Sequence, residues 1–291
     1  MFDLQFLIVQ LLNGLQLSML LFLLAVGLSV VFGLMNFINL AHGTLYMFGA
    51  YFAVSAAKMS GSYWGAFLLA PIGVALIGAI FYKTILVRMQ HDQPMKQVLV
   101  TFAMIFIGFD AVRMIWGNFP EVVPTPGIFS GSTTIFGETY PVYRLFIIGL
   151  GLAVMLLLYI GLERTRIGAI VRAGVDDPDT VATLGINVRR VFFWVFCLGC
   201  YLAGLAGVVA APVFSVFPGM DMSTLILALI VVVVGGPGSL KGAALGSLII
   251  GMADTFGQVL IPGFASVIIY ALMAFILLTR PHGLIPVRTS A

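Results

Sequence analysis

The chain carries no charged residue from Leu4 to Ala57, a run of 54 residues. A transmembrane helix needs about 20 predominantly apolar residues, so this run is too long for one crossing and suits two. Apolar residues make up 61% of the 291 residues and charged residues only 9%. That is more apolar surface than a soluble core requires, so the sequence predicts an integral membrane protein.

Polar breaks divide the chain into nine apolar segments, at about 6–32, 45–57, 63–81, 98–116, 142–162, 191–211, 222–234, 243–260 and 264–278. We therefore expect an all-α polytopic membrane protein with about eight or nine transmembrane segments, two of them short or broken. The count depends on the breaks at 33–43 and 235–241, each of which could be re-entrant. No Lys or Arg precedes the first apolar run, so we expect no cleaved signal peptide.

The basic residues predict the orientation, because Lys and Arg are retained on the cytoplasmic side. With the amino terminus outside, eleven of them fall on the inner side and two on the outer side. The inner ones are Lys83, Arg88, Lys96, the five arginines of loop 164–190, Lys241, Arg280 and Arg288, and the outer ones are Lys58 and Arg144. We expect the amino terminus outside, the carboxyl terminus in the cytoplasm, and loop 117–141 as a compact external cap.

Loop 164–190 holds five arginines and three aspartates in this weakly charged chain. It encloses a short helix with its own start and stop signals: Asp177 can cap it, Pro178 suits the first position, and Gly185 fits a left-handed end. A helix of fewer than about ten residues is not stable alone. It must be held by its own protein or by a partner, unless the loop is only a solvated connector.

Two glycine-punctuated breaks are candidates for chemistry. The first carries Asn36, Asn39, His42 and Gly43. The second, residues 230–242, resembles a phosphate loop, but no Gly directly precedes Lys241 and no Ser or Thr follows it, so we expect no nucleotide site. Broken helices expose backbone groups that suit a water-lined route, although Asn and His could simply satisfy those groups.

A few charged or reactive side chains lie inside the apolar segments. Asp110 and Arg113 are one turn apart and predict a structural ion pair. Asp254 lacks such a charged neighbour, and we expect it to face the bundle interior as a packing or gating contact. Cys197 and Cys200 are the only cysteines and predict ordinary buried thiols, with no metal site.

Three blocks and a closing motif carry a resemblance that covers nearly the whole chain. They are NLAHGTLYMFGAY at 39–51, RTRIGAIVRAGVDDPDTVATLGINVRRV at 164–191, GGPGSLKGAALGSLIIGMAD at 235–254 and RPHGLIP at 280–286. In these blocks the chain resembles the permease subunits of branched-chain amino acid ABC importers of bacteria and archaea. The family often reads Asn-Phe-Ala-His-Gly-Glu where this chain has Leu40 and Thr44, which leaves open branched-chain amino acids, other amino acids, urea or amides as substrate.

The resemblance implies a coupling helix that docks on an ATP-hydrolysing subunit. It assigns this role to Asp177, Pro178, Asp179, Val181, Leu184, Gly185 and Asn187. It also implies two ABC ATPase subunits that bind ATP and Mg, a sister permease or a second copy, and an external solute-binding protein that delivers a small amino acid. The chain itself would hold no cofactor, bind no nucleic acid, catalyse no reaction, and lie in the cytoplasmic (inner) membrane.

We therefore expect a single permease domain over residues 1–291, with the coupling loop at 164–190 in the cytoplasm. The expected substrate path consists of Asn36, Asn39, His42, Gly43, Gly235, Gly236 and Gly238. The alternative is an ion-coupled secondary transporter or a channel for a small polar solute. Such carriers need ionisable groups deep in the bundle, and only Asp110, Arg113 and Asp254 qualify.

Overall fold

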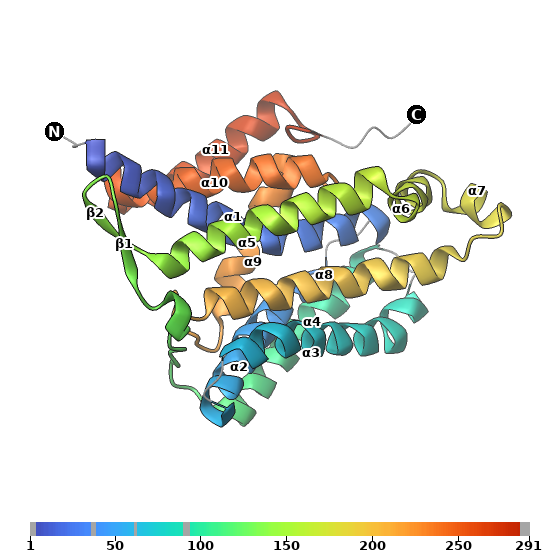
Figure 1. Cartoon of the computed structure of the whole chain (residues 1–291). Helices are drawn as coiled ribbons and strands as arrows, with labels where there is room; N and C mark the ends of the chain where they lie inside the picture. The colour runs from blue at the N-terminus through green and yellow to red at the C-terminus, as the bar shows by residue number, and fades with distance from the viewer. Residues whose placement is uncertain (1–3, 36–38, 61–62, 90–93, 286–291) are drawn as a thin grey trace.

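The structure is a computed structural model that describes residues 4–35, 39–60, 63–89, 94–285. Most of its long helices run roughly along one direction, whereas α9 (Met220–Gly235) crosses them steeply (Figure 1). Helices α6 (Arg166–Asp176) and α7 (Pro178–Thr183) lie at one end of the bundle. The start of α1 (Leu4–Met35) and strands β1 (Ser132–Ile135) and β2 (Glu138–Pro141) lie at the other. We call these the α6–α7 end and the hairpin end.

All nine predicted apolar segments are helices. They are α1 (Leu4–Met35), α2 (His42–Ser60), α3 (Tyr63–Thr84), α4 (Pro94–Trp116), α5 (Val142–Tyr159), α8 (Val188–Ala210), α9 (Met220–Gly235), α10 (Leu240–Leu260) and α11 (Ala265–Thr279). Among the described residues, seven helices are long and apolar enough to cross a membrane, and α9 is a shorter apolar helix. Of the two segments expected to be short, α9 has 16 residues, whereas α2 extends to 19.

Shorter elements connect these helices. They are the 3₁₀ helices η1 (Leu86–Met89), η2 (Gly127–Phe129) and η4 (Pro262–Phe264), the π-helical turn η3 (Ile160–Arg164), and helices α6 (Arg166–Asp176) and α7 (Pro178–Thr183). The fold is also not purely helical, because β1 (Ser132–Ile135) pairs antiparallel with β2 (Glu138–Pro141). Phe136 and Gly137 both have positive φ at the tip, as a type I′ turn requires. Phe is unusual there, which is why the loop gave no hairpin signal.

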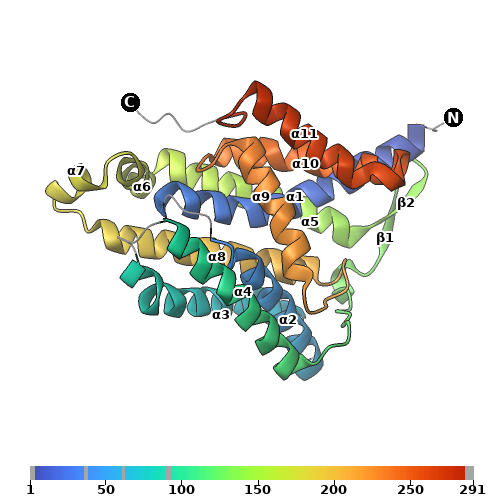
Figure 2. The same cartoon turned by 180° about the vertical axis from the view of Figure 1, so that it is seen from behind.

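Helix α8 forms the centre of the bundle and packs on α1, α2 and α3 (Figure 2). Glycines bring the backbones together: a Cβ on Gly49 of α2 would lie 2.3 Å from the carbonyl oxygen of Gly204 in α8. Helix α1 packs along α10, and among the described helices this pair has the most extensive contact. Close backbone approach is the usual way in which membrane helices gain van der Waals contact.

Two contacts tie the loops together at the hairpin end. Glu121 and Val216 form an antiparallel bridge through their backbone groups. The Lys58 Nζ lies 2.5 Å from Glu121 Oε1, which joins the end of α2 to the same loop. These contacts hold the segment before β1 against the segment before α9.

Candidate functional site

Loop 164–190 contains two helices, whereas the sequence predicted one. The predicted helix is confirmed as α7, and α6 precedes it. The Thr165 hydroxyl accepts from the Gly168 amide at 3.1 Å, which caps the start of α6. Val171 is buried against Val195 of α8, so one apolar face of α6 holds the loop on the bundle. The Thr cap and the spacing of apolar residues after it were the sequence signals for α6.

The ends of α7 follow the sequence signals. Asp177 Oδ1 accepts from the Thr180 amide at 3.0 Å, and Gly185 has a φ of +79°. Val181 is buried, whereas 73% of Leu184 is exposed. Asn187 Oδ1 then accepts from the Arg190 amide at 3.1 Å and caps α8. The side chains of Pro178 and Asp179 lie outside what the structure describes.

Glu163 connects this loop to the start of α10. Its carboxylate lies 3.8 Å from Arg172 Nη1 on α6 and 3.9 Å from Lys241 Nζ on α10. Arg172 also donates to the Leu162 carbonyl. The coupling loop and the second glycine-rich break are therefore joined by a partly exposed network of charges.

In the first break, the polar side chains that the structure describes are buried. Asn36 lies outside the described residues. Asn39 Oδ1 accepts from the Ala41 amide at 3.2 Å, and His42 Nε2 lies 3.0 Å from the Leu24 carbonyl oxygen of α1. Both side chains have no exposed surface. One polar atom of each side chain thus contacts a backbone group, whereas Asn39 Nδ2 and His42 Nδ1 are buried and have no hydrogen-bond partner among the described residues.

Gly43 lies directly against α9. A Cβ at Gly43 would lie 2.7 Å from the Asp221 carbonyl oxygen. On the next residue, the Thr44 hydroxyl donates to Asp221 Oδ2 at 3.2 Å, and both side chains are buried. The break in the first half is therefore packed on the helix that leads to the second break.

The second break is closed by the carboxyl-terminal segment. The Leu284 and Ile285 amides donate to the carbonyls of Val234 and Gly235, both at 2.9 Å. Gly236 has a φ of +109°, and a Cβ there would lie 2.9 Å from the Ile285 carbonyl oxygen. These contacts satisfy the carbonyls at the end of α9, which the break would otherwise leave without partners.

The structure brings the two breaks into contact. A Cβ at Gly33, near the end of α1, would lie 2.9 Å from the Cα of Gly238. Gly238 itself has a φ of +76°. Ser239 then caps α10 by accepting from the Gly242 amide at 3.0 Å. Gly33 and Gly238, about 200 residues apart in the sequence, are therefore in direct contact. We call the described residues 33–35, 39–43 and 235–238 the buried junction, because most of those around this contact, such as Asn39, His42 and Gly235, are buried.

The intrahelical charged residues differ from one another. Asp110 Oδ1 and Arg113 Nη1 lie 4.0 Å apart on the exposed side of α4. Asp254 is only 9% exposed, and its Oδ2 accepts from Gln258 Nε2 at 2.8 Å. The sequence reading noted the lack of a charged neighbour but overlooked Gln258 one turn away.

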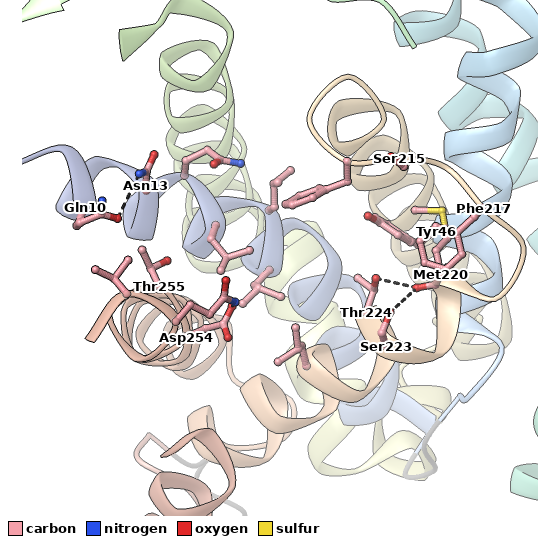
Figure 3. A pocket seen from close by; sticks show the side chains of 18 residues that line it. Gln10, Asn13, Tyr46, Ser215, Phe217, Met220, Ser223, Thr224, Asp254 and Thr255 are labelled. Atoms are coloured by element: carbon pink, nitrogen blue, oxygen red, sulfur yellow. Dashed lines mark hydrogen bonds between the residues drawn. The ribbon is translucent and has the colours of Figure 1, made fainter. Parts of the chain in front are cut away.

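A cavity of about 430 Å³ lies between α1, α9 and α10 near the hairpin end. Figure 3 shows Gln10 and Asn13 of α1, Asp254 and Thr255 of α10, and Ser223 and Thr224 of α9 around it. Sequence reasoning missed this polar lining, because its members come from helices distant in the chain. Among the described residues, no three His, Cys, Asp or Glu side chains are grouped as a metal site would require.

The chain matches a family model described as "Branched-chain amino acid transport system / permease component" over residues 10–277. It is 29% identical to the high-affinity branched-chain amino acid transport system permease protein BraD of Pseudomonas aeruginosa, over 95% of this chain and 94% of that protein. It is 30% identical to the LivH permease protein of Salmonella typhimurium, over the same shares. It is also 26% identical to the LivM permease protein of Escherichia coli, over 93% of this chain and 68% of that protein.

The match covers the buried junction, loop 164–190 and the cavity alike. Proteins of this kind are multi-pass membrane permeases of bacteria and archaea, and they have no ATPase activity of their own. The sequence around Lys241 lacks the pattern of a phosphate loop, in agreement with a permease that does not itself hydrolyse ATP. The chain belongs to the family of permease components of branched-chain amino acid ABC import systems.

Proposed function

We propose that this chain forms half of the transmembrane pathway of an ATP-driven importer for branched-chain or related small amino acids. A sister permease or a second copy would form the other half. Two ATPase subunits would bind ATP and Mg, and an external solute-binding protein would deliver the substrate. The observation that carries the proposal is the match of the permease family to residues 10–277.

The proposal places the α6–α7 end in the cytoplasm and the hairpin end outside. The distribution of Lys and Arg supports this orientation, since eleven of the 14 then lie inside and two outside, and the remaining one, Arg113, lies within α4. In this orientation Leu184 extends from the end of α7 toward the cytoplasm, with 73% of its surface exposed. An exposed leucine on a helix that is itself held by caps suits a dry contact with a partner protein.

Coupling would run from loop 164–190 into the bundle. The residues proposed for it are Asp177, Pro178, Asp179, Val181, Leu184, Gly185 and Asn187. The charge network of Glu163 with Arg172 and Lys241 offers a route from the loop to the start of α10. When the ATPase subunits close, movement of the loop would change the relative positions of α9 and α10, as alternating access requires.

The buried junction at 33–43 and 235–238 is proposed as the constriction of the path. In this state Asn39 Oδ1 and His42 Nε2 contact backbone groups, whereas Asn39 Nδ2 and His42 Nδ1 have no hydrogen-bond partner among the described residues. A closed constriction of this kind suits a resting permease, which must not leak solute. The carrier or channel alternative loses its support, because the family is that of ABC permeases and the Asp110–Arg113 pair lies on the bundle exterior.

Labelling with membrane-impermeant thiol reagents tests the orientation. In a cysteine-free background, Thr183→Cys should react only from the cytoplasmic face and Ser130→Cys only from outside. Thr183 is the last residue of α7, and Ser130 lies just before β1. These two elements lie at opposite ends of the bundle (Figure 1). Reaction of both from one face would contradict the proposed topology.

Co-purification and uptake test the function itself. The tagged permease should recover ATPase subunits from its native membrane, and the complex in proteoliposomes should take up leucine only with ATP and the external binding protein. Uptake driven by an ion gradient without ATP would instead establish a secondary carrier. A urea or amide preference in competition experiments would keep the ABC mechanism and change the substrate.

A further inference from the structure

The lining of the cavity near the hairpin end changes from polar to apolar along α1. The permease function does not by itself explain this change. Along α1, the lining residues run from polar to apolar: Gln10, Asn13 and Gln16 come first, and Leu17 and Leu20 follow. Their spacing of three to four residues places them on one face of the helix. A solute that enters from the hairpin end would meet amide groups first and leucine side chains deeper in the bundle.

Asp254 is the one charged side chain among the described residues that line the cavity. Its partner is the neutral Gln258, and none of the described basic side chains forms an ion pair with it. A carboxylate held inside a membrane bundle without a counter-cation is costly and typically marks a functional position. Its negative charge would be compensated by a cationic group that enters the cavity.

Gln16 supplies the complementary feature. It lines the same cavity, is only 5% exposed, and within the described structure its Nε2 has no hydrogen-bond partner. A buried amide donor without an acceptor has lost its hydrogen bonds to water and gained none in return. An acceptor on a bound solute, such as a carboxylate oxygen, would satisfy it.

We propose that this cavity is a binding site for an amino acid zwitterion with an apolar side chain. Asp254 binds the ammonium group, Gln16 donates to the carboxylate, and the side chain lies against Leu17 and Leu20. The cavity volume of about 430 Å³ is within the range of small-molecule sites. The inference rests on the proposed function, in which the permease transports such a solute. It places the first binding site for that solute in the external half of the permease.

The side-chain class follows from the lining. Besides the leucines of α1, the wall of α9 contributes Met220 and Leu227. Asp254 is the one charged group among the described lining residues, and the nearby Arg144 is already engaged, because its Nη1 donates to Asn13 Oδ1 at 2.6 Å. A second charge on the solute would therefore find no free partner there. Leucine, isoleucine and valine therefore fit, whereas glutamate and lysine do not.

Thiol reactivity in the assembled complex tests the charge of the cavity. Thr255→Cys lies beside Asp254 and lines the cavity, and Cys197 and Cys200 are first replaced by alanine. A cationic methanethiosulfonate should react at least fivefold faster than an anionic one of similar size. Asp254→Asn should reduce that preference to near unity, whereas Asp110→Asn, on the exterior of α4, should leave it unchanged. Equal rates in the parent, or no reaction with either reagent, would overturn the proposal.

Protection by three probes tests the ligand. Leucine and 3-methylbutylamine, which both carry an ammonium group, should slow the labelling, whereas 4-methylpentanoate, which lacks one, should not. Asp254→Asn should raise the leucine concentration for half protection about tenfold. Gln16→Met should raise it for leucine but leave the amine unaffected, because the amine has no carboxylate. Since a merely misfolded variant would lose both ligands, this second variant decides the matter if Asp254→Asn fails to assemble.

Uptake by the same complexes separates the two proposals. If the parent complex takes up no amino acid under any condition, the proposed function fails, while the labelling still reports on the cavity. If the parent takes up leucine and Asp254→Asn does so at the same rate and half-saturation, with protection intact, the zwitterion site is wrong and the proposed function stands.

Discussion

Loop 164–190 and the buried junction, in the part that the structure describes, are built in opposite ways. Within the loop, α6 packs on α8 through Val171, but the end that carries α7 is held largely by local hydrogen bonds, such as that from the Thr180 amide to Asp177, and leaves Leu184 exposed. The junction is held by contacts across the whole chain, from Gly33 to Gly238 and from Ile285 to Gly235. Local caps can loosen without unfolding the bundle, whereas distant backbone contacts cannot.

That difference suits a transporter in which a partner displaces loop 164–190 and the buried junction closes the substrate path. Elements that move during function generally have few buried contacts and modest local stability. A gate must instead exclude solute, which requires close packing and satisfied backbone groups. Substitutions in the two regions should therefore have different consequences: loss of stability at the junction and loss of partner binding at the loop.

Gly236→Leu should have the largest effect. Gly236 has a φ of +109°, and a side chain there would meet the Ile285 carbonyl oxygen. The strained backbone and the overpacking each cost about 1–3 kcal/mol. The unfolding temperature of the purified permease should fall by roughly 10 °C. Gly149→Leu, where a Cβ meets nothing within 4 Å, is the control and should change little. A normal unfolding temperature with abolished transport would show that the glycine serves the path and not the packing.

Leu184→Asp should have the next largest effect, on assembly and not on folding. The side chain is 73% exposed, so the aspartate is solvated in the free permease but desolvated in a dry contact with a partner. Recovery of ATPase subunits in pull-downs should fall about tenfold, which corresponds to about 1.4 kcal/mol. Ile128→Asp is the matched control, since Ile128 is 75% exposed at the hairpin end. Equal recovery from the two variants would make loop 164–190 a solvated connector.

Asp177→Ala should weaken α7 alone. The lost cap costs about 1 kcal/mol, which corresponds to roughly fivefold faster hydrogen exchange of the 178–183 amides. Asp177→Asn keeps an acceptor for the Thr180 amide and should exchange at the parent rate. Hydrogen-exchange mass spectrometry of the assembled and the free permease would measure both. Unchanged exchange in Asp177→Ala would mean that packing of Val181, and not the cap, holds the helix.

The sequence predicted what is encoded locally. The nine apolar segments and the two ends of α7 follow from hydropathy and from Asp177, Pro178 and Gly185, all of which act on near neighbours. Helix α6 was missed although Thr165 carried a local cap signal, because the charge of the loop drew the interpretation toward one short helix. The hairpin was missed because Phe136 adopts a positive φ that its side chain disfavours.

The sequence did not predict what depends on distant partners. The polar residues of the first break were identified from the sequence. Nothing near them in the chain indicates that His42 contacts the Leu24 carbonyl or that the Thr44 hydroxyl donates to Asp221. The cavity was missed for the same reason. Gln16 and Asp254 are unremarkable one at a time, and only the packing of α1 on α10 places them around one space.

Glu163→Gln should have the smallest effect, and it tests whether the two regions are connected. The Glu163 carboxylate lies 3.8 Å from Arg172 and 3.9 Å from Lys241, so it joins α6 to the start of α10. All three side chains are partly exposed, and exposed ion pairs contribute only about 0.2–1 kcal/mol.

Folding and ATPase recovery should remain normal. The number of amino acids transported per ATP should fall by less than about threefold, and the difference from the parent should disappear in high salt because salt screens the parent pair too. Glu121→Gln, which removes an ion pair with Lys58 at the hairpin end, should leave that ratio unchanged. If both variants keep the parent number of amino acids transported per ATP at low salt, movement of loop 164–190 is transmitted to the junction through the packing of α6 on α8 instead.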